Sequence, residues 1–225
     1  MADLTALFPQ NAGKALPLPH LPTVSGSSIL WLGDFCINDL GMLVDYRGKA
    51  NELIVLPDSL QAIGANAFLG ARSLESITIP ANVTFVGSGA FASCNALGEI
   101  IVAPGNSCYA SVGGALIDRT GLLVAVAGIP DSGDYAVPHG VSAIGASAFS
   151  GMENLRRVII SEGILSIGSN AFSGCSHPES ITIPESCTSI DLTGVAKSVT
   201  LIVAPGSAAE AYAMSRGFPY EYILH

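Results

Sequence analysis

Apolar residues recur along this chain in one template with a period of about 23 residues, which lies in the range of known solenoid repeats. The template is clearest in residues 77–98, ITIPANVTFVGSGAFASCNALG, and residues 54–74 repeat its apolar positions, its glycine and its Ala-Phe pair. Further copies begin near Tyr135 and Val158. Consecutive copies place their phenylalanines one period apart, at Phe68 and Phe91 and again at Phe149 and Phe172. A fixed period of this size predicts a solenoid, in which each unit packs only against its neighbours.

The template predicts one strand and one bend in each unit. Residues 77–79 alternate β-branched side chains, which favours a short strand with both isoleucines on one face. Pro80 ends the strand because proline cannot donate to a sheet ladder. Gly87 is expected to form a bend that needs a permissive backbone. Residues 90–94 have the spacing of a 3₁₀ or α-helical turn. The phenylalanines are therefore expected to form a stack inside the core.

Two segments interrupt or precede the regular copies. Residues 31–47 predict a hairpin that covers the open end of the first repeat, and residues 115–126 predict a second hairpin around the turn Asp118-Arg119-Thr120-Gly121. The predicted organisation is an N-terminal extension (1–30) and one repeat domain (31–225). The domain divides into a hairpin cap (31–52), repeats (53–102), a hairpin insert (103–134), repeats (135–200) and a C-terminal cap (201–225). The repeats are expected to form one continuous stack.

The C-terminal cap is predicted to contain a helix. Ser207 is followed three residues later by Glu210, which is the pattern of a capping box. Gly217 ends the predicted helix, with Arg216 in its last turn. Residues 220–223 are expected to add a last short strand.

The template resembles the BspA-like leucine-rich repeat, whose pattern is close to I-x-I-P-x-x-V-x-x-I-G-x-x-A-F-x-x-C-x-x-L. The resemblance covers about residues 34–223, and Ser161 in place of the proline is one departure. It implies a leucine-rich-repeat solenoid: a right-handed β/α superhelix of about seven parallel strands, mostly β, with short 3₁₀ or helical turns and a β-hairpin insert. It also implies a bacterial cell-surface or secreted protein that adheres to host or neighbouring-cell proteins.

Composition limits the classes of partner. The net charge is −9, from 18 acidic and 9 basic residues, which argues against nucleic acid and against an anionic membrane surface. No apolar run of about 18 residues is present, so no membrane insertion is expected. The N-terminal residues do not have the pattern of a signal peptide, and no anchor motif is visible. The five cysteines are expected to be buried structural residues, because Cys94 and Cys175 share one template position.

No pattern in the chain indicates catalysis. The four histidines are scattered without the spacing of metal ligands. Gly87-Ser88-Gly89 is better explained as part of the template than as a nucleophile elbow. We therefore predict no enzyme activity, no catalytic residue, no cofactor and no metal.

The outward face of the predicted strands is the candidate binding surface. Ile101 and Ile159 occupy outward positions, where a solvated strand would be polar. Two simpler explanations remain open: β-branched residues favour strands, or the inserted hairpin covers them. The candidate protein-binding residues are Thr78, Glu99, Ile101, Arg157, Ile159 and Thr182. The predicted function is a non-catalytic protein–protein interaction module, with cell-surface adhesion or host-protein binding as its role. The alternative is an intracellular scaffold or a structural segment of a larger assembly.

Overall fold

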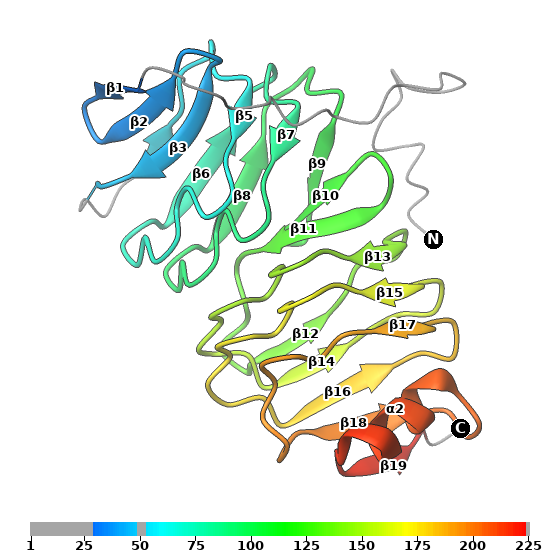
Figure 1. Cartoon of the computed structure of the whole chain (residues 1–225). Coiled ribbons are helices and arrows are strands. Elements are labelled where there is room, and N and C mark those ends of the chain that lie inside the picture. Colours follow the sequence, from blue (N-terminus) through cyan, green and yellow to red (C-terminus); the bar gives the residue numbers. More distant parts are fainter. Residues whose placement is uncertain (1–28, 49–52, 224–225) are drawn as a thin grey trace.

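A computed structural model describes residues 29–48 and 53–223 of the chain. The predicted extension 1–30 lies outside the described residues except for its last two, Ile29 and Leu30, which begin a strand. Within the described residues the chain forms short strands that wind into a solenoid, and one helix closes its C-terminal end (Figure 1). The predicted solenoid is therefore confirmed.

The solenoid consists of two halves, which we call the first half (residues 29–108) and the second half (residues 109–223). Each half has two sheets, one of them built from longer parallel strands and the other from a three-stranded antiparallel hairpin unit continued by two-residue strands. In the first half the longer strands are β4 (Leu53–Val55), β6 (Ser76–Ile79) and β8 (Glu99–Val102), and the other sheet contains β1 (Ile29–Leu32), β2 (Phe35–Asn38), β3 (Met42–Tyr46), β5 (Ala62–Ile63) and β7 (Phe85–Val86).

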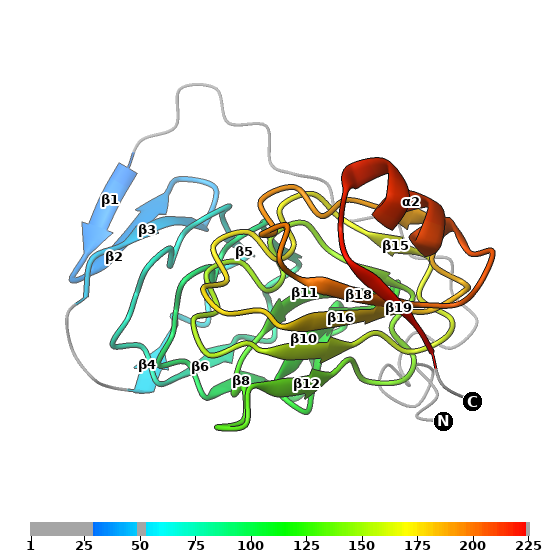
Figure 2. The ribbon, with the colours of Figure 1, turned by 90° about the horizontal axis from the view of Figure 1, so that it is seen from below.

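The second half repeats this arrangement and extends it by further turns (Figures 1 and 2). Its longer strands are β12 (Asp134–Ala136), β14 (Arg157–Ile159), β16 (Ser180–Ile183), β18 (Thr200–Val203) and β19 (Tyr220–Tyr222). Its other sheet contains β9 (Tyr109–Val112), β10 (Ala115–Asp118), β11 (Leu122–Val126), β13 (Ala143–Ile144), β15 (Ser166–Ile167) and β17 (Ser189–Ile190). The helix is α2 (Ala208–Arg216).

The two halves are joined by hydrogen bonds between loops, whereas no strand pairing among the described residues joins the longer strands of one half to those of the other. The backbone N–H of Ser93 donates to the Ser150 carbonyl at 2.9 Å, so a loop of the first half meets a loop of the second directly. Strands β8 and β12, in contrast, belong to different sheets. The longer parallel strands therefore form two separate sheets.

The buried apolar side chains likewise fall into two clusters, one in each half. The hairpin unit β9–β11 stands between them. Leu116 packs into the cluster of the first half, while Ala115 and Ile117 pack into that of the second. This segment therefore separates two cores as well as joining them.

The predicted phenylalanine stack is confirmed within each half. The rings of Phe68 and Phe91 lie 5.3 Å apart and nearly parallel, and those of Phe149 and Phe172 lie 4.9 Å apart. Each ring is at most 3% exposed. The ring contacts within the described residues do not join Phe91 to Phe149, so each half has its own short stack.

The template glycine has a different purpose from the one expected. The backbone of Gly87 is not left-handed, but a Cβ added there would lie 2.3 Å from the Ala65 nitrogen of the preceding repeat. Gly168 has the same close approach to Ala146, at 2.7 Å. The glycine is therefore needed because two repeats touch through their backbones. The left-handed residue occurs two positions later, with positive φ at Asn66, Gly89, Ser147 and Asn170.

The segment predicted as an insert has a close counterpart at the start of the described chain. Strands β9, β10 and β11 have the same lengths as β1, β2 and β3 and are separated by turns of the same lengths. Both units have a β-bulge at the equivalent place, after Cys36 and after Leu116. Both turns are closed by one side-chain oxygen: Asn38 Oδ1 accepts from two backbone N–H groups, and so does Asp118 Oδ1. The two halves therefore begin with the same structural unit.

The two halves end differently after the same four residues, Val-Ala-Pro-Gly. In the first half Asn106 follows, and its amide bridges the last turn of the first half to β9. In the second half Ser207 follows and accepts from the backbone N–H of Glu210 at 3.2 Å as the N-cap of α2. The predicted helix and its end at Gly217, which is left-handed, are both confirmed.

Candidate protein-interaction surface

The outward face of the longer strands carries the predicted binding residues, but on two sheets. Thr78, Glu99 and Ile101 lie on β6 and β8, whereas the other three lie on β14 and β16. Thr78 pairs directly with Ile101 across β6 and β8, and Ile159 pairs with Thr182 across β14 and β16. The structure therefore brings these residues together as two groups of three.

Both predicted isoleucines are exposed on this face. Ile101 is 37% exposed and Ile159 is 52% exposed. The hairpin unit β9–β11 pairs with β13, in the other sheet of the second half, and leaves Ile159 open. The explanation that the hairpin covers Ile159 is therefore wrong.

A groove of about 660 Å³ lies on the outward face at the C-terminal end of the second half, and its walls are mostly apolar. Ile159, Thr182 and Ile202 come from three neighbouring strands and are in register across them. The next strand, β19, continues this row with Glu221 beside Ile202. The residues lining the groove are Ile159, Thr182, Ile202, Glu221, Tyr222 and Ile223.

Four groove residues were not among the predicted binding residues, and three of them were missed because they follow the helix of the C-terminal cap. Glu221, Tyr222 and Ile223 follow α2, and only the pairing of β19 with β18 brings them to the sheet. The residue pattern predicted a last short strand at 220–223, but its parallel register against β18 depends on how α2 returns the chain. Ile202 belonged to the outward row in the sequence and could have been included.

Tyr222 is held in place by the helix cap. Its hydroxyl donates to Glu210 Oε1 at 2.6 Å, and the backbone N–H of Gly206 donates to Oε2 of the same carboxylate at 2.6 Å. These two hydrogen bonds hold the pKa of Glu210 below its usual value, and the bond from Tyr222 has the larger effect. The same bond raises the pKa of Tyr222 to about 12, because it stabilises the protonated hydroxyl. Strand β19 is thus fixed to the N-terminal end of α2 through Tyr222.

Arg157 lies beside the groove in a small ionic network. Its Nε is 3.2 Å from Glu179 Oε2 and 3.7 Å from Asp134 Oδ1, and Arg156 also contacts Glu179 at 3.4 Å. All four side chains are roughly half exposed, so each pair contributes at most about 1 kcal/mol. The network neutralises Arg157 locally and leaves no excess of positive charge there.

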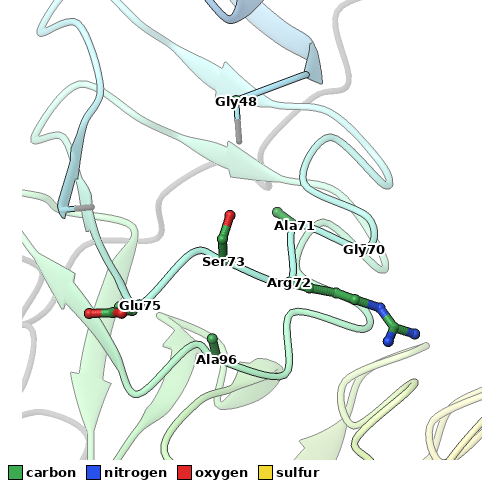
Figure 3. Close-up of a pocket in the computed structure, with 7 residues that line it drawn as sticks. All are labelled: Gly48, Gly70, Ala71, Arg72, Ser73, Glu75 and Ala96. Carbon is green, nitrogen blue, oxygen red and sulfur yellow. The ribbon is translucent and has the colours of Figure 1, made fainter. Parts of the chain in front are cut away.

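A second hollow, of about 520 Å³, lies among the loops of the first half (Figure 3). It exists because its lining is made largely of small residues, including Gly70, Ala71, Ser73 and Ala96. The Arg72 side chain points away from the hollow and pairs with Glu153 of the second half at 3.3 Å. This hollow presents little that could recognise a ligand.

The cysteines do not have the properties of reactive thiols. All five are free, and burial raises the pKa of Cys94 to about 12 and that of Cys187 to about 11. Thiols with such pKa values are protonated at neutral pH and are poor nucleophiles. Over the described ranges, no three histidine, cysteine, aspartate or glutamate residues gather in a way that could hold a metal ion. No helix in the described part of the chain is long and apolar enough to cross a membrane.

Comparison with known proteins gives the chain a family and a fold. A family model described as the BspA type leucine-rich-repeat region matches six copies, over residues 46–111 and 133–199. No match was found among curated protein sequences. A leucine-rich cell surface protein from Faecalibacterium prausnitzii has a similar structure, with a TM-score of 0.54 and 26% sequence identity over 76% of this chain and 53% of that chain.

Two other solved structures resemble the chain less closely. A leucine-rich-repeat protein from Eubacterium ventriosum has a TM-score of 0.48 and 18% identity over 68% of this chain and 48% of its own. The pneumococcal vaccine antigen PcpA has a TM-score of 0.44 and 17% identity over 77% of this chain and 68% of its own. The chain spans about half the length of the first two proteins.

Proposed function

Because the chain belongs to the BspA-type leucine-rich-repeat family, we propose that it is a non-catalytic protein-interaction module that binds its partner on the outward face of the second half. Leucine-rich repeats of this kind are typically protein-interaction modules rather than enzymes. The observation that carries the choice of surface is the groove, where Ile159 is 52% exposed on an outward strand face, a position that is normally polar in a solvated sheet.

We propose cell-surface adhesion or host-protein binding as the biological role. The support is the similarity to a leucine-rich cell surface protein of Faecalibacterium prausnitzii, at 26% identity. The partner would be an extracellular or surface protein of a host or a neighbouring cell. Nucleic acid is disfavoured as a partner by the net charge of −9.

The experiment measures binding of the whole chain to a panel of extracellular-matrix and host-surface proteins by surface plasmon resonance. Ile159→Glu places a charge in the groove, and Ile101→Glu places one on the outward face of the first half. Leu165→Glu is the matched control, because Leu165 is 57% exposed in the turn before β15. We expect Ile159→Glu to abolish binding while Leu165→Glu binds like the wild type.

Other results would change the assignment. Binding lost only in Ile101→Glu would move the site to β6 and β8. Binding retained by all three variants would place it on the loops or hairpin units. If no protein of the panel binds, the adhesion role is wrong, and the alternative of an intracellular scaffold or a segment of a larger assembly becomes the better explanation.

A further inference from the structure

The groove has the length of a short extended peptide. Its lining row crosses four neighbouring strands, from Ile159 on β14 to Glu221 on β19. Strands lie about 4.8 Å apart, so three steps span about 14 Å, which an extended chain covers with about four residues. The groove therefore accommodates a short segment that lies across the strands.

Among the described residues that line the groove, the charge is negative and no basic residue balances it. Glu221 lines the groove, and its carboxylate makes no hydrogen bond or ion pair with any described residue. None of the groove-lining residues is basic. The nearby Arg157 is already placed between Asp134 and Glu179. A cationic side chain from a partner would therefore have a free carboxylate next to an apolar surface.

Strand β19, which carries Glu221, is held in place from its opposite face. The Tyr222 hydroxyl is fixed by Glu210 at 2.6 Å, and the Tyr220 and Tyr222 rings meet edge to face at 5.8 Å. Ile159 and Ile202 project from neighbouring strands of one sheet. Little conformational entropy is lost when a rigid surface of this kind binds a peptide.

We propose that this groove binds an extended segment of about five residues whose first and third side chains are large and apolar and whose fifth is lysine or arginine, because alternate side chains of an extended chain face the same way. The two apolar side chains contact Ile159 and Ile202, and the basic side chain pairs with Glu221. This proposal rests on the proposed function and adds the chemical class of the partner segment. The general acidity of the protein, with a net charge of −9, would also favour the approach of a basic partner.

The test uses two acetylated and amidated pentapeptides, Leu-Ser-Leu-Ser-Lys and Leu-Ser-Leu-Ser-Glu, added to the whole chain. Isoleucine methyl groups of the protein are labelled with ¹³C, so that NMR shifts locate the binding site as well as measure affinity. The variant Glu221→Gln removes the free charge. The matched control is Glu185→Gln, an exposed glutamate in the turn after β16.

At low salt we expect the lysine peptide to shift the methyl signals of Ile159, Ile202 and Ile223. We expect it to bind roughly three- to tenfold more tightly than the glutamate peptide, as one or two exposed charge pairs allow. Glu221→Gln should reduce this preference to about twofold or less, whereas Glu185→Gln should leave it unchanged. The preference should fall at 0.5 M salt because screening weakens exposed charge pairs.

Three results would overturn the proposal: equal affinity for the two peptides, shifts confined to other isoleucines, or no shift for either peptide up to millimolar concentration. None of these results would remove the proposed function by itself. If host proteins bind the wild type and Ile159→Glu abolishes their binding, the groove is still the interaction surface. In that case only the proposed class of partner segment is wrong.

Discussion

The substitution Asn106→Ala should be among the most destabilising polar changes in the molecule. Asn106 is 5% exposed, and its side chain forms hydrogen bonds with backbone groups of four residues. Its Nδ2 donates to the carbonyls of Pro80 at 2.8 Å and Val83 at 3.0 Å. Its Oδ1 accepts from the backbone N–H groups of Cys108 at 2.8 Å and Tyr109 at 2.9 Å.

Alanine at this position would leave four backbone groups without these partners. A net contribution of about 0.5–1.5 kcal/mol for each of the four hydrogen bonds gives an expected loss of about 2–6 kcal/mol in the free energy of unfolding. That is a large part of the roughly 5–15 kcal/mol available to a typical domain. The matched control is Asn82→Ala, because the Asn82 amide is exposed and donates a single hydrogen bond, to the Asp58 carbonyl at 2.9 Å. Its expected cost is below about 1 kcal/mol.

The assay is urea unfolding followed by two signals. Trp31 is the only tryptophan in the chain and lies in the first half, so its fluorescence reports that half, whereas far-ultraviolet circular dichroism reports both halves. Since Asn106 bridges the last turn of the first half to β9, we expect Asn106→Ala to separate the two transitions as well as lower stability. A loss no larger than that of Asn82→Ala, with coincident transitions, would refute this reasoning.

Three further predictions concern the core, the repeat contact and the cap. Phe149→Ala should lower the free energy of unfolding by about 3–5 kcal/mol, because the ring is fully buried in the stack; a thermal melt without loss would contradict its core position. Gly87→Ala should destabilise by about 1–3 kcal/mol because its Cβ would lie 2.3 Å from the backbone of the preceding repeat, whereas Gly98→Ala, with its nearest atom at 3.7 Å, should change the urea midpoint little. Tyr222→Phe should raise the pKa of Glu210 toward its usual value in an NMR titration. Because the folded pKa of Glu210 is lowered, its contribution to stability is present above the unfolded pKa and is lost as pH falls through the folded pKa, and this acid dependence should weaken in the variant.

The repeat template was sufficient to predict the elements that depend on local sequence. The strand at β6, the buried phenylalanines and the helix from Ala208 to Arg216 all follow from patterns within one repeat or one cap. Two neighbouring copies already define which side chains face the core, since each repeat packs only on its neighbours. The hairpins at 31–47 and 115–126 were found for the same reason, because each closes on itself.

What the sequence did not show depends on contacts between repeats. The close backbone approach at Gly87 depends on the position of Ala65, one repeat earlier, and a glycine alone does not distinguish close contact from a left-handed bend. Likewise, the longer spacing between copies around residues 103–134 indicated that a segment interrupts the repeats. The spacing did not show that the hairpin unit in this segment buries side chains in both cores. The groove could not be predicted because it forms only where β19 pairs with β18, and this pairing depends on the length and direction of α2.

One hairpin unit serves as an end in the first half and as an interior wall in the second. The difference can be traced to two pairs of equivalent residues. In the interior unit Ala125 and Ala127 are at most 6% exposed and pack into the cluster of the first half.

At the equivalent positions the end unit has Asp45 and Arg47, which form an ion pair at 3.0 Å. The Arg47 guanidinium also lies over the Trp31 ring, 4.4 Å from its centre. Burying this ion pair under another repeat would require removing both charges from water, which the mutual attraction of the pair seldom offsets. The same backbone thus accepts a neighbouring core where it carries small apolar residues and resists one where it carries charge. Since α2 closes the other end, a further repeat is disfavoured at both described ends, and the site that we propose for a partner lies on the outward strand faces between them.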